Sequence, residues 1–288
     1  MRKIIISAFI IFGFGLQAQD LPVPSPACTL DQRVGLTDIK IEYSRPGVKD
    51  RTVFGELVPY GEVWRTGANK VPNLTFSTDV NFGGTNVEAG TYALLTIPQE
   101  ESWIIMLNSE TEMWGTGNYD EAKNVAMVES MPTSTEFTET FTIDINDIRN
   151  SKASLVLRWE KTEVKVPLEV EVHPIAVENI AIAIEESDEE AKWRVYRNAA
   201  GYYFNSKQSM DKALEYITQS VKENPDSWYS HWLHAEILAE QNDYKAAIKA
   251  AKESMKVGET TAKKEETEFG YSDMIEEAID NWKEMKNS

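Results

Sequence analysis

The stretch LVLRWEKTEVKVPLEVEV, residues 155–172, indicates the fold of the first part of the chain. Apolar residues alternate at Leu155, Leu157 and Trp159, and alternate again from Val164 to Val172. Alternation with a period of two is the pattern of a strand that buries one face. Lys161-Thr162 separates the two runs, so we expect an antiparallel hairpin that turns at this dipeptide.

The same alternation extends from this stretch toward the N-terminus. It recurs in short apolar runs between turn residues such as Gly83-Gly84, at residues 39–43, 74–82, 91–97, 103–107 and 141–145. No helical period separates these runs. We therefore expect seven to nine strands that form an antiparallel β-sandwich or jelly roll over residues 27–172.

On the C-terminal side, the pattern changes at His173-Pro174. Apolar residues then recur every three to four positions, which indicates helices over residues 173–288 and an α+β protein of two domains. Several small residues recur after 34 positions, a period that resembles tetratricopeptide repeats. The matching pairs are Gly201/Ala235, Ala213/Ala247, Ile217/Ala251 and Ser220/Ser254. Helices at 175–186 and 274–285 are expected to cap the two repeats or to dock them on the β-domain.

The first 19 residues have the features of a signal peptide. Arg2 and Lys3 precede an apolar run that is short for a membrane span, and Ala18 offers a small residue for cleavage. Residues 20–26 contain the proline-rich tether PVPSP. We expect an exported protein of the periplasm or the extracellular space with no membrane span after cleavage; the alternative is a retained anchor. Cys28, the only cysteine, is expected to be an unpaired thiol in the tether region.

The charge of the chain excludes two classes of partner. Its 288 residues include 29 basic and 47 acidic side chains, a net charge of −18, and residues 173–288 alone carry 23 acidic and 14 basic ones. Nucleic acid and anionic lipid both need a basic surface. We therefore expect neither partner, and the charge favours solubility.

The chain lacks the residues that most kinds of catalytic site need. The chain has three histidines, His173, His231 and His234, and none lies in the β-domain, so a Ser-His hydrolase within that domain is excluded. No nucleotide-binding loop is present. We therefore predict no metal, no cofactor and no assigned catalytic residue. Carboxylates near the tryptophans could still act in pairs, as in glycosidases; they are Glu56, Glu62, Asp79, Glu88 and Asp120.

Two irregular segments interrupt the strands and could form one ligand site. Residues 42–69 and 108–124 are rich in Arg, Trp, Tyr and Gly, and loops of a sandwich gather at its ends. The predicted ligand-binding residues are Arg45, Arg51, Tyr60, Trp64, Arg65, Asn69, Trp114 and Tyr119. Guanidinium groups hold anions in two places, and aromatic rings stack on sugars or apolar groups. The alternative is that these side chains only fix their own loops and plug the end of the core.

The first segment also carries a family resemblance. Its motifs are Tyr43-Ser44-Arg45-Pro46, Val53-Phe54-Gly55, Leu57-Val58-Pro59-Tyr60-Gly61 and Val63-Trp64-Arg65-Thr66-Gly67-Ala68-Asn69, followed by Ala89-Gly90-Thr91-Tyr92, Trp114-Gly115 and Leu157-Trp159-Glu160. Residues 24–172 thereby resemble the DUF2911 family of exported bacterial proteins, which is typical of Bacteroidetes envelopes and often has a helical tail. The resemblance implies no established activity.

Three functions remain open. The expected one is a binding or interaction module for an unknown small molecule, glycan or peptide, with a protein partner for the helical repeats. The alternative is a carbohydrate-active enzyme that hydrolyses glycans. A third is a structural role, in which the repeats hold a partner and the β-domain is a spacer.

Overall fold

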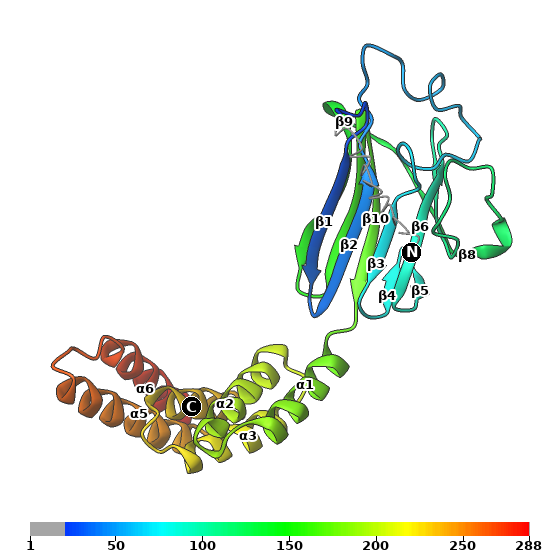
Figure 1. Cartoon of the computed structure of the whole chain (residues 1–288). Coiled ribbons are helices and arrows are strands. Elements are labelled where there is room, and N and C mark those ends of the chain that lie inside the picture. Colours follow the sequence, from blue (N-terminus) through cyan, green and yellow to red (C-terminus); the bar gives the residue numbers. More distant parts are fainter. Residues whose placement is uncertain (1–20, 288) are drawn as a thin grey trace, which may run out of the picture. The chain divides into compact units, whose positions relative to one another are not determined.

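A computed structural model describes residues 21–287 of the chain, so the predicted signal peptide lies outside the described residues. The chain divides into two compact units between Val172 and His173 (Figure 1). The first is built from antiparallel sheets and the second from helices, as expected of an α+β protein. No helix within residues 21–287 has both the length and the apolar composition that a membrane crossing needs.

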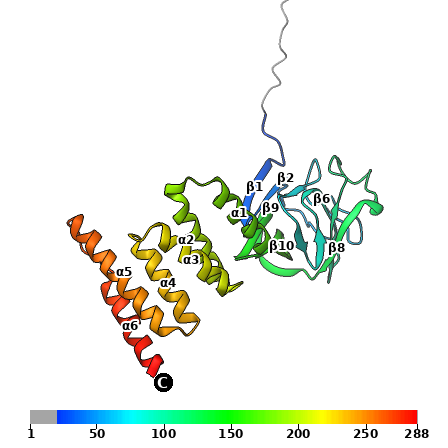
Figure 2. The same cartoon turned by 90° about the horizontal axis from the view of Figure 1, so that it is seen from below.

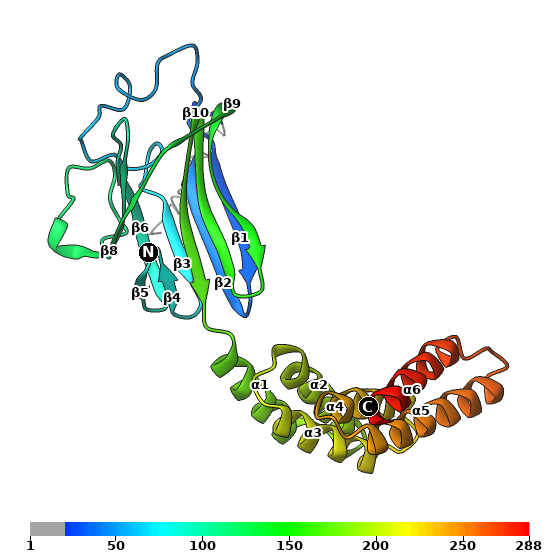
Figure 3. The same ribbon diagram turned by 180° about the vertical axis from the view of Figure 1, so that it is seen from behind.

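The described part of the first unit contains ten strands in two sheets. In chain order they are β1 Ala27–Val34, β2 Thr37–Ser44, β3 Asn73–Phe76, β4 Val80–Phe82, β5 Thr85–Val87, β6 Gly90–Ile97, β7 Trp103–Asn108, β8 Asn124–Ser130, β9 Thr133–Arg149 and β10 Lys152–Val170. The six-stranded sheet has the order β1-β2-β3-β6-β7-β8, and the four-stranded sheet has the order β5-β4-β10-β9. Figure 3 shows β9 and β10 as the longest strands of the unit.

Alternation explains how each strand contributes to the core. In β2, Thr37, Ile39, Ile41 and Tyr43 are buried, while the residues between them are more exposed. Strands of both sheets contribute buried side chains to one apolar core, here called the shared core. The strands expected at residues 91–97 and 103–107 are present as β6 and β7, which pair antiparallel. The Gly83-Gly84 turn joins β4 to β5, also as expected.

The hairpin predicted at Lys161-Thr162 is wrong. Residues 152–170 form one continuous strand, β10, whose hairpin partner is the preceding strand β9. The pairing shifts register on both sides of Glu160, which has a positive φ of 55°. A β-bulge of this kind adds a residue and moves the apolar set from odd to even positions. The change of phase in the sequence therefore marks a bulge, and no turn is present there.

Cys28 was expected in the tether region and instead lies in β1. It pairs with Tyr43 of β2 and packs partly buried against the shared core. Burial raises the pKa of the Tyr43 hydroxyl to about 12. That hydroxyl accepts from the backbone N–H of Ile143 at 3.0 Å, so Tyr43 fastens β2 to β9 of the other sheet.

The second unit consists of six described helices. They are α1 His173–Glu186, α2 Glu189–Ser206, α3 Met210–Glu223, α4 Trp228–Glu240, α5 Tyr244–Lys264 and α6 Ser272–Asn287. Short connections join successive helices, and from α2 to α6 each packs against the next (Figure 2).

The 34-residue spacing has structural counterparts in this unit. Ser220 Oγ of α3 donates to the Trp193 carbonyl of α2 at 2.8 Å, and Ser254 Oγ of α5 donates to the Trp228 carbonyl of α4 at 2.8 Å. The N-caps also correspond: the Ser209 side chain caps α3 by accepting from the Lys212 N–H, and the Asp243 side chain caps α5 by accepting from the Ala246 N–H. The sequence repeat therefore follows two helical hairpins that are held together by equivalent bonds.

Candidate functional site

The first irregular segment extends the six-stranded sheet beyond the end of β3. Trp64 forms an antiparallel bridge with Thr96 of β6, with N···O distances of 2.7 and 3.0 Å. Thr66 is fully buried and donates from its hydroxyl to Thr96 Oγ1 at 3.1 Å. The backbone of residues 64–66 is therefore fixed against β6.

Trp64 points into the shared core. Its ring contacts those of Phe54, Trp103, Phe141 and Trp159, with centroid separations of 5.3 to 6.3 Å, and it stacks on Trp159 at an interplanar angle of 13°. Contacts of this kind hold aromatic rings firmly in place. Trp64 thus closes one end of the core, and its ring faces away from any ligand on the outer side of the sheet.

Arg45 and Arg51 hold backbone rather than face a ligand. The Arg45 Nε donates to the Phe141 carbonyl at 3.0 Å. The Arg51 guanidinium donates to the carbonyls of Val48 and Gly47 at 2.9 and 2.7 Å. Arg45 therefore ties the first segment to β9, and Arg51 closes the turn in which it lies.

Asn69 also serves the segment itself. Its φ is 60°, a left-handed conformation that Asn tolerates better than most residues. Its Nδ2 donates to the Ser25 carbonyl at 3.3 Å and to Ser44 Oγ at 3.2 Å. Asn69 thereby joins the tether, the end of β2 and the motif.

The outer face of the six-stranded sheet, opposite the shared core, carries a second apolar cluster. Val63 packs there, and because Arg65 flanks Trp64 on the other side, Arg65 points to this face too. The second irregular segment covers the same face through a bridge between Lys70 and Trp114. We call the buried members the outer cluster: Val71, Ala93, Leu95, Met106 and Met113. At this bridge the second segment lies beside the residue that directly follows the first segment.

Arg65 is the unusual residue of this face. Within the part of the chain that the structure describes, its guanidinium has no hydrogen bond and no ion pair, and its Nε is buried without a partner. A Cβ placed on Gly115 would lie 4.0 Å from its Nη1, an ordinary contact distance, so the second segment lies close to this guanidinium. A buried guanidinium nitrogen without an acceptor is costly, and an anion would satisfy it.

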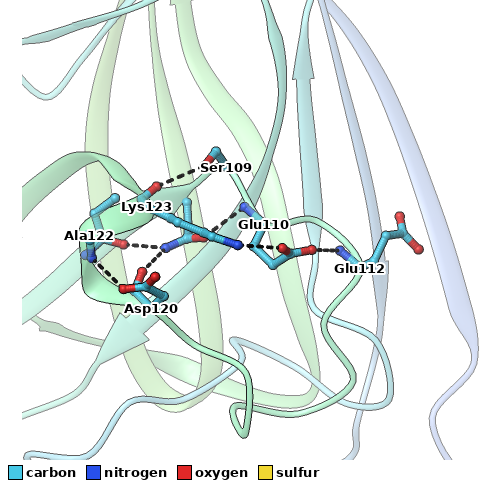
Figure 4. A network of polar contacts seen from close by, with 8 residues as sticks. Ser109, Glu110, Glu112, Asp120, Ala122 and Lys123 are labelled. Atoms are coloured by element: carbon cyan, nitrogen blue, oxygen red, sulfur yellow. Dashed lines mark hydrogen bonds and ion pairs between the residues drawn. The ribbon is translucent and has the colours of Figure 1, made fainter.

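The second segment is anchored by a buried amide. Asn108 is fully buried, and its Nδ2 donates to the Asp120 carbonyl at 2.9 Å and to Asn124 Oδ1 at 2.8 Å. Figure 4 shows polar contacts of the same segment, in which Lys123 pairs with Glu110; the two groups are 2.9 Å apart. That ion pair raises the pKa of Lys123 and lowers the pKa of Glu110. The two ends of the segment are thereby held together, and residues 114–118 project beyond this base.

Trp114 and Tyr60 are the exposed aromatics among the predicted site residues, with 76% and 40% of their surface accessible. Beside Trp114, the Lys70 ammonium pairs with Glu112 at 2.8 Å. Tyr60 covers Gly55, and Glu100 and Glu160 influence its hydroxyl. Burial, followed by these two charges, raises the pKa of Tyr60.

Tyr119 is half-buried against the outer cluster. Its hydroxyl accepts from Asn124 Nδ2 at 2.8 Å and lies 3.4 Å from the Met106 sulfur. Tyr119 therefore packs on the outer cluster, and its ring is less accessible than that of Trp114.

Two of the carboxylates considered for a glycosidase-like pair instead accept hydrogen bonds from the backbone. Asp79 accepts from the Ala89 N–H at 2.8 Å, and Asp120 caps the short helix Glu121–Lys123 by accepting from Ala122 at 3.0 Å. Across residues 21–287, no three His, Cys, Asp or Glu side chains gather in a way that could hold a metal ion.

The histidines of the helical unit are also explained by their surroundings. His231 is buried, with its Nε2 at 2.9 Å from the Pro225 carbonyl. Burial, and then the neighbouring His231, lowers the pKa of His234, and burial raises the pKa of Glu236. Burial thus disfavours the charged forms of His234 and Glu236, as expected of side chains packed between helices.

The predicted site residues thus separate into two groups. Arg65, Trp114 and Tyr119 lie on the outer face, whereas Arg45, Arg51, Asn69 and Trp64 hold backbone or fill the core. Tyr60 belongs to neither group, since it is exposed and covers Gly55. The motif of residues 63–69 supplies both groups, and the segment around Trp114-Gly115 completes the outer face. The chain belongs to the DUF2911 family. The family profile, described as a protein of unknown function, matches residues 25–168.

The DUF2911 match covers both irregular segments and most of the strands, and it ends before the helical unit. No curated protein matches the sequence closely enough to indicate a relative. Sequence reasoning missed Lys70 and Glu112, which flank Trp114, and the anchor Asn108. Polar residues that lie tens of positions apart produce no periodic pattern in the sequence. Contacts between them, such as the ion pair of Lys70 with Glu112, can therefore be recognised only in the folded structure.

Proposed function

We propose that this DUF2911 protein is an exported cell-envelope binding protein of Bacteroidetes type. Its β-unit, a sandwich, binds a ligand that carries an anionic group beside a ring, such as an acidic sugar unit of a glycan. The helical hairpins are tetratricopeptide-like repeats. The ligand lies on the outer face of the six-stranded sheet, between Arg65 and Trp114.

The observation that carries the proposal is the unpartnered Arg65. The chain has 47 acidic side chains, and yet no described carboxylate pairs with this guanidinium. Charged side chains that are partly buried are normally paired. A carboxylate or phosphate of a ligand would supply the two acceptors that a guanidinium fork fits.

The exposed Trp114 supports the same proposal. A tryptophan with 76% of its surface accessible adds little to the core, whereas its flat face suits a sugar ring. Its backbone bridge to Lys70 fixes the position of the segment relative to Arg65. The ring and the guanidinium would then act as two fixed contact points.

The test is a thermal-shift screen of the mature protein against galacturonic acid, oligogalacturonides and their neutral galactose counterparts. We expect the acidic ligands to raise the melting temperature. At a ligand concentration of about 100 times the dissociation constant, binding adds roughly 2.7 kcal/mol to the free energy of unfolding. Arg65→Gln and Trp114→Ala should each abolish the shift. The control Arg149→Gln, at an exposed arginine of the same unit, should retain it.

The stability of the free variants gives a second measure. Arg65→Gln removes no hydrogen bond, so the free energy of unfolding should change by less than about 1 kcal/mol. Arg45→Gln removes the bond to the Phe141 carbonyl and should cost about 1 to 3 kcal/mol. A loss of several kcal/mol on Arg65→Gln, or a ligand shift that survives it, would show that Arg65 is part of the scaffold.

A further inference from the structure

A second group of guanidiniums without carboxylate partners lies in the helical unit, near the start of α2. The Arg194 guanidinium lies 4.5 Å from the centre of the Trp193 ring, and Arg197 lies 5.2 Å from it. Arg197 is also 5.5 Å from the ring of Tyr229 on α4. The two arginines are therefore held by aromatic faces rather than by acids.

The same group continues across α4 toward α6. Tyr229 contacts Trp228 at 5.6 Å, and Trp228 stacks on Tyr271 at 4.6 Å. Phe269 packs against both Trp228 and Tyr271. We call this row the aromatic strip: Trp193, Arg194, Arg197, Tyr229, Trp228, Tyr271 and Phe269. Tyr229 and Tyr271 are about half accessible, so the strip reaches the surface along its length.

The strip crosses the beginnings of three helices. Trp193 lies in the second turn of α2, Trp228 is the first residue of α4, and Tyr271 immediately precedes α6. The N-terminal end of a helix carries a partial positive charge. Acidic residues lie in the first turns of α2 and α6, namely Glu189, Glu190 and Asp273, and Asp226 precedes α4; Glu189 pairs with Lys192 at 2.7 Å. Preference for an anion therefore depends on the two guanidiniums.

Neither guanidinium pairs with a carboxylate among the described residues, although the helical unit contains many acidic side chains. Among the described residues neither Arg194 nor Arg197 forms an ion pair, and the Arg197 Nε is buried with no hydrogen-bond partner. Its Nη2 donates only to Asn198 Oδ1, at 3.3 Å. Burial is the main cause that lowers the pKa of Arg197; the Tyr229 hydroxyl, the next influence, acts in the opposite direction, and the positive charge of Arg194 lowers the pKa further. Arg197 thus bears a desolvation cost that no acid in its own unit offsets.

We propose that the aromatic strip binds an acidic peptide segment of a partner protein. Carboxylates of the segment pair with Arg197 and Arg194, and its backbone and apolar side chains lie along Tyr229 and Tyr271. Arginine, tyrosine and tryptophan are the residues that contribute most to protein interfaces. A row across three helices also fits an extended chain better than it fits a single small anion.

The test uses the full mature protein and a short fluorescein-labelled oligo-glutamate peptide, read by fluorescence anisotropy at low salt. Because the net charge of −18 repels such a peptide, binding requires a local site. We expect saturable binding that oligo-glutamine does not show and that added salt weakens. Arg197→Gln should weaken it about tenfold or more, since charge-assisted bonds contribute about 1.5 to 3 kcal/mol.

Matched variants distinguish the aromatic strip from other positively charged places on the chain. Lys245→Gln removes an exposed charge of the same unit, and Arg65→Gln removes the proposed ligand site of the β-unit; both should bind the peptide as the parent does. Arg194→Gln, at an exposed position, should weaken binding with the helical circular dichroism unchanged.

Three results would overturn the inference. The first is no binding of oligo-glutamate by the parent protein. The second is binding that Arg65→Gln removes and Arg197→Gln does not, which would place the peptide at the β-unit. The third is full competition by inorganic phosphate at equal charge concentration, which would show a simple anion site.

Discussion

Residues of the same type have different roles in this protein: one arginine or tryptophan belongs to the scaffold and another is available for a ligand. The surroundings of each side chain determine its role. Arg45 donates to a carbonyl of β9, whereas Arg65, twenty residues later in the same irregular segment, has no acceptor among the described residues. Trp64 is packed among four aromatic rings, whereas Trp114 is largely accessible. The motif of residues 63–69 therefore combines scaffold and candidate site within a few positions.

Gly67 is the residue of the motif that the backbone requires. Its φ is 145°, and a Cβ there would lie 3.0 Å from the Ser44 carbonyl oxygen. We expect Gly67→Ala to lower the free energy of unfolding by about 1 to 3 kcal/mol, since both the backbone conformation and the close approach would be strained. Urea unfolding followed by tryptophan fluorescence measures the change.

Gly61→Ala is the matched control for that prediction. Gly61 has a φ of 78°, and no atom lies within 4 Å of the position that an alanine methyl would take, so only the backbone strain of about 1 kcal/mol applies. A larger loss at Gly61 than at Gly67 would show that the contact with Ser44 does not matter.

At the scale of elements, repeated small contacts hold the helical hairpins together. Ser220 and Ser254 stand 34 residues apart, are fully buried, and donate to carbonyls of the preceding helix at the same distance. The four small or apolar pairs of the repeat coincide with places where helices meet. This arrangement explains why the period is visible in the sequence.

We expect Ser220→Ala and Ser254→Ala each to destabilise the helical unit by about 1 kcal/mol, because each removes one buried hydrogen bond. Thermal melts followed by circular dichroism at 222 nm would measure the loss. Thr218→Ala removes an exposed bond to the Leu214 carbonyl and should change stability by less than about 0.5 kcal/mol. Unequal effects of the two serines, with one near zero, would contradict the equivalence of the hairpins.

At the scale of the whole molecule, two units with separate cores follow each other along the chain. The shared core draws on strands from β1 to β10, whereas the helical clusters contain residues after Val172 alone. We expect a chain that ends at Val172 to unfold cooperatively as an all-β protein. The helical unit by itself should be marginal, because two repeats bury little surface.

Circular dichroism and urea titration of the two truncated chains check this expectation. Aggregation of the β-unit, or the absence of a cooperative transition, would show that the helices complete its core. Full stability of the isolated helical unit would show instead that α1 and α6 are sufficient caps.

The α+β class, the family, the position at which strands give way to helices and the location of several strands all follow from the amino-acid sequence. These features depend on local periodicity and composition, which each segment expresses without its neighbours. The bulge at Glu160 could not be predicted in this way. A shift of the apolar alternation from odd to even positions looks the same whether the chain turns or one strand contains an extra residue. Strand β1 was missed for a related reason, since its polar residues hide the alternation.

Tertiary contacts, in contrast, settle which of the eight predicted residues remain available for a ligand. Arg45, Arg51 and Asn69 are bonded to carbonyls supplied by distant or irregular backbone, and Trp64 is surrounded by the rings of four other residues. Whether a guanidinium is paired depends on what the rest of the chain brings within about 3 Å of it, and no local pattern carries that information. For the same reason the two arginines whose buried Nε has no hydrogen-bond partner among the described residues, Arg65 and Arg197, could be recognised only after the chain had folded.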